Sequence, residues 1–247
     1  FILPKELLEH DCVISLIKMK THALERITGA VKNSYGFVYG FHKAKGHTQY
    51  PSADSFARML IDLNKCVAPK LYVMDGIVAM EGNGPGSGDP VPMNVLLMST
   101  DPVALDSVFS RLVYLKPEMV PTNYHGEKMG LGTWKEEEIT LLTPDGEISM
   151  AEAVKKYGNP AFNVDRTEVR KNIWTRMAGA LNIFQKKPYI EADKCVRCGI
   201  CVQSCPVPGK AVDFRKGKGK PPVYDYRKCI RCFCCQEMCP KKAIKVK

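Results

Sequence analysis

The sequence lacks several features that would point to a membrane or nucleic-acid-binding protein. No apolar run approaches the roughly 18 residues that a membrane span needs, so we expect no membrane-spanning segment. No basic strand interleaved with aromatic residues is present, and we expect no nucleic-acid partner. There is no signal peptide, and the first residue is Phe1 rather than Met, from which we expect a fragment or a processed chain. Cysteine is scarce over most of the chain, because only Cys12 and Cys66 of the eleven lie outside residues 195–239.

The other nine cysteines include two runs of four with the same spacing. The first run is Cys195-Val-Arg-Cys198-Gly-Ile-Cys201-Val-Gln-Ser-Cys205-Pro206, and the second, 34 residues later, is Cys229-Ile-Arg-Cys232-Phe-Cys-Cys235-Gln-Glu-Met-Cys239-Pro240. Thiolates at this spacing, with proline after the fourth, are typical of cubane iron–sulfur clusters. The close triplet wraps three corners of one cube and the fourth cysteine reaches the other, so two copies brace each other. We therefore predict two [4Fe-4S] clusters with the ligand sets Cys195, Cys198, Cys201 and Cys239 for the first, and Cys205, Cys229, Cys232 and Cys235 for the second.

Zinc and disulfides are the alternatives for these cysteines. Zinc ribbons use two cysteine pairs with a long spacer rather than two runs of four, and a disulfide framework requires an oxidising compartment. Cys234 fits neither ligand set, and we expect it to pack beside the cube, with a substitute ligand as the alternative. Residues 188–247 resemble the bacterial two-cluster ferredoxins.

The positive charge is concentrated in the same part of the chain. Residues 186–247 hold sixteen Lys or Arg and five Asp or Glu, which gives them a net charge of +11. The whole chain carries +10, so the first 185 residues sum to about −1. Each oxidised cubane with four thiolates carries about two negative charges, so the loaded tail remains basic. We therefore expect an acidic redox partner protein. Thiols that serve as cluster ligands also imply a reducing compartment, so we expect a cytoplasmic protein.

The first part of the chain alternates between strand-like and helix-like segments. Apolar runs predict strands over 11–19, 70–75 and 91–98 and an edge strand over 138–143. Amphipathic spacing predicts helices over 52–67, 101–115, 120–132 and 149–158, whereas the polar residues 41–51 are expected to form a loop. The alternation predicts an α/β fold with a mostly parallel sheet flanked by helices.

Three parts are therefore expected along the chain. Residues 1–164 would form the α/β domain, lacking its N-terminal part. Residues 165–187 form a basic amphipathic connector that would dock on one of the two domains. Residues 188–247 would form a small α+β ferredoxin-like domain with two clusters.

Five short motifs are spread over about residues 11–110. They are Lys18-x-Lys20-Thr21-His22, Thr28-Gly29-x-x-Lys32-Asn33-x-x-Gly36, Asp75-Gly76, Glu81-Gly82-Asn83-Gly84-Pro85-x-x-Gly88 and Asp101-Pro102-Val103-Ala104-x-Asp106. In order and spacing they resemble the family known as domain of unknown function 362. The resemblance implies a domain that usually starts further upstream and is often fused to a two-cluster ferredoxin module. Its reaction is not established.

Polar groups follow three of the predicted strands. Because ligands bind outside the carboxyl ends of strands in open parallel sheets, we expect these groups to converge on a pocket. The candidate catalytic residues are Lys20, His22 and Glu81, and the candidate substrate-binding residues are Lys18, Lys32, Asn33, Asp75, Asn83 and Asp101. The cations would bind a small anionic or carbonyl substrate, while a carboxylate would act as a base or coordinate a metal.

Each of these residues also has a structural explanation. Asp101 before Pro102 suits a helix N-cap, and the glycines of residues 82–88 suit tight turns. That loop matches neither the Walker motif nor Gly-x-Gly-x-x-Gly, so we do not predict nucleotide binding.

Three functions remain open from the sequence. The first is an iron–sulfur electron-transfer protein or oxidoreductase whose α/β domain holds a substrate or partner. The second is a non-enzymatic ferredoxin-type carrier with the α/β domain as a docking adaptor. The third is a hydrolase or ligase in which the clusters are structural and redox-silent.

Overall fold

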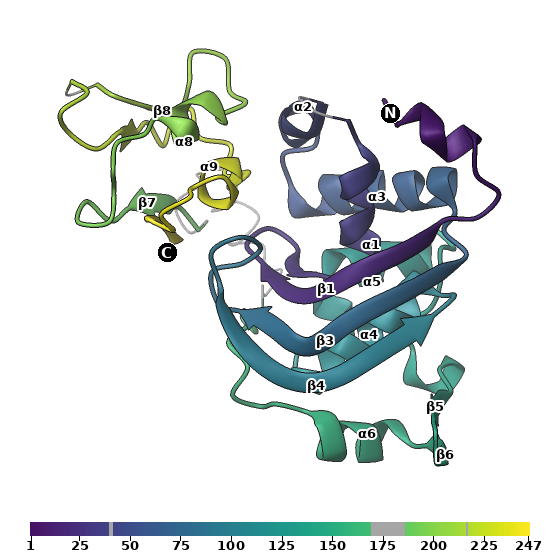
Figure 1. Ribbon diagram of the computed structural model, residues 1–247. Helices are drawn as coiled ribbons and strands as arrows, with labels where there is room; N and C mark the ends of the chain where they lie inside the picture. The colour runs from purple at the N-terminus through teal and green to yellow at the C-terminus, as the bar shows by residue number, and fades with distance from the viewer. Residues whose placement is uncertain (40–41, 169–185, 216) are drawn as a thin grey trace, which may run out of the picture. The chain divides into compact units, whose positions relative to one another are not determined.

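The computed structural model describes residues 1–39, 42–168, 186–215 and 217–247 (Figure 1). The chain divides into two compact units, Phe1–Asp165 and Arg166–Lys247, which we describe separately. Most of the predicted connector, residues 165–187, lies outside the described residues. Within the described ranges, no helix is long and apolar enough to cross a membrane.

A four-stranded mixed sheet in the order β2-β1-β3-β4 forms the centre of the first unit. Its strands are β1 (Ile14–His22), β2 (Arg26–Thr28), β3 (Leu71–Glu81) and β4 (Asp89–Ser99). The α/β class is confirmed, although only β1 and β3 pair in parallel, while β1–β2 and β3–β4 are antiparallel. The glycine-rich residues 82–88 return the chain directly into β4 with no crossover helix, and a connection that short permits only antiparallel pairing.

The described residues of this unit form six α-helices, of which the last four lie within the ranges predicted from the sequence. They are α1 (Ala30–Asn33), α2 (His42–Gln49), α3 (Ala53–Val67), α4 (Pro102–Leu112), α5 (Pro121–Lys128) and α6 (Met150–Tyr157). The remaining elements are the short 3-10 helices η1 (Lys5–Leu8), η2 (Ser34–Phe37), η3 (Pro117–Met119) and η4 (Glu136–Glu138), and the hairpin of β5 (Leu141–Thr143) and β6 (Gly146–Ile148). Ser52 begins α3 as its cap, accepting the Ser55 N–H at 3.1 Å.

The expectation of a loop over residues 41–51 is wrong, because helix α2 occupies most of it. His47 is buried and stacks on Phe56 of α3, with ring centroids 4.5 Å apart. The Tyr35 hydroxyl donates a hydrogen bond to the Lys43 carbonyl at 2.6 Å. These tertiary contacts stabilise a polar segment whose sequence has no apolar helical period of its own.

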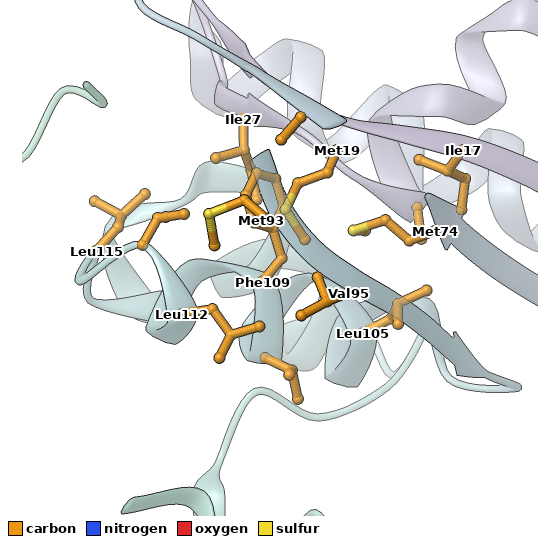
Figure 2. Close-up of a cluster of buried hydrophobic side chains, with 14 of the residues drawn as sticks. Ile17, Met19, Ile27, Met74, Met93, Val95, Leu105, Phe109, Leu112 and Leu115 are labelled. Atoms are coloured by element: carbon orange, nitrogen blue, oxygen red, sulfur yellow. The ribbon is translucent and has the colours of Figure 1, made fainter. Parts of the chain in front are cut away.

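One face of the sheet carries the main core of this unit. Figure 1 shows α4 and α5 behind the strands, and Figure 2 shows the side chains between them meeting around Met19, Met93 and Phe109. Burying each of these side chains contributes roughly 1.5–3 kcal/mol. The alternate residues of β1 and β4, such as Leu16 and Leu96, face away from this core and are exposed.

The second unit is small and internally repeated. Its paired strands are β7 (Pro188–Ile190) with β10 (Ile244–Val246) and β8 (Val212–Asp213) with β9 (Val223–Tyr224), and its helices are α8 (Ile200–Gln203) and α9 (Cys234–Glu237). The backbone before each helix takes the same left-handed turns, with φ of +59° at Arg197 and +56° at Arg231. Each run of cysteines therefore wraps in the same way.

Candidate functional site

The first predicted cysteine set surrounds one cavity of the second unit. The cavity is partly open to solvent, and its lining includes Cys195, Cys198, Cys201 and Cys239. Three of these cysteines belong to the first run, and Cys239 comes from the end of the second run. The rest of the lining is mostly apolar, as at Ile190 and Ile244.

The second predicted set surrounds another cavity in the same unit. This cavity is also partly open to solvent, and its lining includes Cys205, Cys229, Cys232 and Cys235. Cys205 is the last cysteine of the first run, so each cavity is lined by three cysteines of one run and the fourth cysteine of the other. The assignment of the two sets as cluster ligands stays a prediction.

The chemistry of both cavities fits a cubane cluster. All eleven cysteines have free thiols, and the two cavities hold four of them each. In the described ranges, no group of three or more His, Cys, Asp or Glu side chains is close enough to hold a single metal ion. A cube with four metal corners needs sulfurs spread around a cavity rather than around a point, which is the arrangement here.

Hydrogen bonds reach several of the sulfurs. The Tyr224 hydroxyl donates to Cys235 Sγ at 3.1 Å, and the Ala211 N–H donates to Cys205 Sγ at 3.3 Å. Burial raises the pKa of the Cys201 thiol to about 11 and also raises the pKa of Cys235. Iron binds thiolates, so these protons would be released as a cluster assembles.

Cys234 is buried and lines neither cavity. A hydrogen bond with Cys232 is the main cause that raises the pKa of the Cys234 thiol, with burial second. The structure thus gives Cys234 the neighbouring position expected from the sequence, where its S–H contacts a ligand sulfur.

In the first unit, the carboxyl ends of β1 and β3 meet at one edge of the sheet, because these strands are parallel. The Thr21 hydroxyl donates to the Gly82 carbonyl at 3.0 Å and joins the two strand ends. His22 is buried, and its Nδ1 accepts the N–H groups of Leu24 at 3.2 Å and Glu25 at 3.1 Å. A neutral His22 would therefore carry its proton on Nε2.

The other candidates at this edge are held by the backbone around them. Glu81 Oε2 accepts the N–H of Asn163 at 2.7 Å. Lys20 is half-buried and lies opposite Met80 in the sheet register, and Asn83 is half-buried in the glycine-rich loop. Lys20, His22, Glu81 and Asn83 thus belong to one edge of the sheet.

Lys18, Asp75 and Asn33 have structural partners. Lys18 and Asp75 are opposite each other on β1 and β3, and their exposed side chains form an ion pair at 2.7 Å. That ion pair and the Ile77 N–H lower the pKa of Asp75. The Asn33 amide lies 3.4 Å from both Ser15 Oγ and the Leu16 carbonyl, and ties α1 to β1.

The structure does not bring Asp101 to this edge. Since β4 runs antiparallel to β3, Ser99 at its end lies beside Tyr72 at the start of β3. Asp101 caps α4, accepting the N–H groups of Val103 at 2.7 Å and Ala104 at 2.9 Å. The structure therefore shows Asp101 as a helix cap, which was the alternative interpretation from the sequence.

Asp106 also has a structural role, because it links α4 to α1. It is fully buried in α4, and its carboxylate accepts the Ala30 N–H at 2.5 Å and the Val31 N–H at 3.1 Å. These are N–H groups of the first turn of α1, so Asp106 caps a helix far away in sequence. Burial raises the pKa of Asp106 to about 7, against the opposing effect of the two hydrogen bonds.

Glu25 is the residue that the sequence analysis missed. It lies in the turn between β1 and β2, is fully buried, and neither carboxyl oxygen finds a hydrogen-bond partner among the described residues. Burial raises its pKa well above the usual value, and the charge of the nearby Lys32 opposes this. A lone acidic residue between His22 and Lys32, in an otherwise apolar or basic segment, was the available signal.

Replacing Glu25 with glutamine is expected to stabilise the protein at pH 8. Because folding raises this pKa, the group favours folding below its ordinary value of 4.5, and that contribution is lost as pH rises through the folded pKa. Removing the buried charge should raise the free energy of unfolding by about 1–3 kcal/mol at pH 8 and by much less at pH 5. Anaerobic urea unfolding at both pH values measures this, with the exposed Glu147→Gln as control. An equal effect at both pH values would contradict it.

An α/β unit joined to a unit with two four-cysteine cavities defines an iron–sulfur protein of the ferredoxin-containing class. The family model "Domain of unknown function (DUF362)" matches residues 1–111, and the model of a 4Fe-4S dicluster domain matches residues 187–240. The chain therefore carries a DUF362 domain followed by a 4Fe-4S dicluster domain, which confirms the resemblance seen in the sequence.

A curated relative is the thylakoid-associated protein sll1697 of Synechocystis, which is 42% identical over 130 residues. The match covers 52% of this chain and 40% of that protein, so the chain spans less than half the length of the relative it matches. No solved structure matches the chain.

Proposed function

We propose that the protein is an iron–sulfur electron-transfer protein or oxidoreductase that passes electrons through two [4Fe-4S] clusters. The α/β domain would hold the substrate or partner at the other end of the transfer. The observation that carries the proposal is the pair of cavities with four free thiols each. The 4Fe-4S dicluster match supports electron transfer as the chemistry of this unit.

Anaerobic reduction with dithionite tests this function. The loaded protein is expected to show reversible bleaching of its visible absorption and an EPR signal from two interacting reduced clusters. Clusters that cannot be reduced, or that are destroyed by one cycle, would favour the structural role and overturn the proposal.

The candidate substrate site is the sheet edge with Lys20, His22 and Glu81. Lys20 and Lys32 would attract an anionic oxygen, while His22, with Nδ1 held as an acceptor, would present an Nε2 proton. Glu81 would fix the glycine-rich loop through Asn163 or act as a base. A small anionic substrate suits this set of side chains.

A non-enzymatic carrier is the second candidate, and the pairing of several site residues favours it. Lys18 binds Asp75, Asp101 caps α4 and Glu81 binds a backbone N–H, so these groups already have structural partners. In that case the α/β domain would be a docking adaptor for the ferredoxin-type unit.

A triple variant, Lys20→Met with His22→Gln and Glu81→Gln, separates the two candidates. For an enzyme we expect unchanged iron content and cluster EPR but loss of any small molecule that co-purifies anaerobically, measured by mass spectrometry. Lys18→Met with Asp75→Asn is the matched control, because it removes a nearby ion pair that is exposed. If the triple variant leaves all redox function and all co-purifying molecules unchanged, the hypothesis of a substrate pocket is wrong and the α/β domain is a docking adaptor.

The protein's surroundings follow from the same chemistry. Eleven free thiols favour a reducing compartment, and we propose a cytoplasmic location. The net charge of +11 over residues 186–247 favours an acidic redox partner protein.

A further inference from the structure

We infer that the first cysteine site, formed by Cys195, Cys198, Cys201 and Cys239, is the port through which electrons are exchanged with an acidic electron-transfer protein. The second site is then a relay enclosed within its unit. This inference rests on the proposed electron-transfer function and adds to it the side of the module that a partner meets.

The internal repeat provides a matched comparison of the two sites. Arg197 and Arg231 occupy the same position between the first and second cysteines of each run, with nearly the same φ. Arg197 is exposed, whereas only 7% of Arg231 is exposed. Val196 is 53% exposed, whereas the equivalent Ile230 is half-buried. The same motif is therefore open at the first site and covered at the second.

The ligand thiols follow the same trend. At the first site Cys198 is exposed and Cys195 and Cys239 are partly exposed. At the second site Cys205, Cys232 and Cys235 are all buried, and Cys229 alone is partly exposed. Electron transfer between proteins requires a close approach to the cluster, and the first site permits it.

Charge distinguishes the two cavities as well. Arg197 and Lys241 line the first cavity, whereas no charged side chain in the described ranges lines the second. Arg197 Nη1 donates to the Gly219 carbonyl at 3.1 Å, which holds the exposed Lys218 and Lys220 to the same side of the unit.

Two exposed apolar side chains adjoin ligand cysteines of the first site. Val196 and Met238, each next to a ligand of the first site, are 53% and 56% exposed. An apolar patch with a charged rim is the usual composition of a protein interface, and small interfaces of this kind suit transient redox encounters. The cationic rim selects a partner with carboxylates around its own redox centre and speeds the encounter.

The second site is closed by its own hydrogen bonds. Tyr224 donates to Cys235, Ala211 donates to Cys205, and Cys234 is hydrogen-bonded to Cys232. The sulfurs of the second site are thus covered by groups of the protein itself, which keeps a partner protein from approaching them.

Charge reversal with oxidants of opposite sign tests the port. The reduced holoprotein gives one electron per event to tris(oxalato)cobaltate(III), an anion, or to hexaamminecobalt(III), a cation, and cobalt(III) becomes cobalt(II). Arg197→Glu with Lys241→Glu should slow oxidation by the anion about tenfold at low ionic strength and accelerate oxidation by the cation. A changed cluster potential would move both rates in the same direction, so opposite changes identify docking.

The matched control reverses two exposed cations beside the second run. Arg227→Glu with Lys228→Glu changes the net charge equally and should leave both rates within about twofold. An oxidised acidic flavodoxin serves as the protein probe, and its rate should fall about tenfold in the first double variant only.

If the two double variants change the oxidation rates equally, or if the Arg227 and Lys228 variant changes them more, the inference that partners dock at the first site is wrong. So would binding of phosphatidylglycerol vesicles that blocks the anionic oxidant, because the surface would then face a membrane. If the clusters cannot be reduced at all, no oxidation rate can be measured. That result would refute the proposed electron-transfer function itself.

Discussion

Replacing Cys235 with alanine is expected to remove about half of the iron and inorganic sulfide from the chain. Each cubane cluster takes four thiolates, so a site with three keeps its cluster poorly, and about eight iron atoms per chain should fall to about four. Cys235 is buried in the lining of the second cavity, and the rest of that lining apart from the cysteines is mostly apolar, so it offers no ready replacement ligand. Colorimetric iron and sulfide assays on anaerobically purified protein measure the loss.

Cys234→Ala is the matched control, because this thiol is the sequence neighbour of Cys235 and is also buried. It lines neither cavity, so the variant should keep its full iron content. Loss of its hydrogen bond to Cys232 should still perturb the spectrum of one cluster. If Cys234→Ala loses iron and Cys235→Ala keeps it, the ligand assignment is wrong.

Single substitutions also test the exchange of the fourth cysteines. Cys205→Ala should leave the same EPR spectrum as Cys232→Ala, because both would remove the second cluster. Cys239→Ala should instead match Cys198→Ala, because both would remove the first. The opposite grouping would assign each run of four to a single cluster.

Local patterns account for what the sequence predicted well. Helix α3 is foreseen over 52–67 and found at Ala53–Val67, because its cap and its apolar period both lie within the segment itself. The cysteine cavities follow from spacing in the same way, since three ligands of each set lie within seven residues. Short-range geometry can be predicted from a sequence because few other conformations satisfy it.

Long-range pairing accounts for what was missed. The antiparallel course of β4 depends on which partner strand it meets, and this separates Asp101 from the sheet edge with His22. Helix α2 depends on the stacking of His47 on Phe56 of α3, and the sequence of the segment itself does not predict this contact. The burial of Glu25 likewise results from elements packed around it, so its place as a lone acidic residue between His22 and Lys32 marked it as unusual without showing that it is buried.

Some of the DUF362 motifs stabilise the fold, and others lie at the proposed site. Thr28-Gly29 and Asp101 to Asp106 meet where Asp106 caps α1, a role that needs no substrate. Lys20, His22 and the loop from Glu81 lie where β1 and β3 end, and Lys20 is the neighbour of Thr28 in β2. The motif residues at that edge are the ones that the proposed pocket would use.

Gly29→Ala is expected to destabilise the α/β unit by about 3–5 kcal/mol. A Cβ on residue 29 would lie 1.9 Å from Asp106 Oδ1, so the carboxylate has to move. Moving the carboxylate breaks its hydrogen bonds to the N–H groups of Ala30 and Val31, which are both fully buried residues. Anaerobic urea unfolding followed by circular dichroism measures the change.

A double-mutant cycle tests that the two residues act through this contact. Asp106→Ala alone should cost about 3 kcal/mol by leaving two buried N–H groups without an acceptor. Once that carboxylate is absent, Gly29→Ala meets no obstacle, so the double variant should be less destabilised than the sum of the singles. Gly36→Ala is the control within the same motif, because a Cβ there meets nothing within 4 Å, and it should change stability by less than about 0.5 kcal/mol. Additive effects of Gly29→Ala and Asp106→Ala would show that the glycine is required for some reason other than room for the cap.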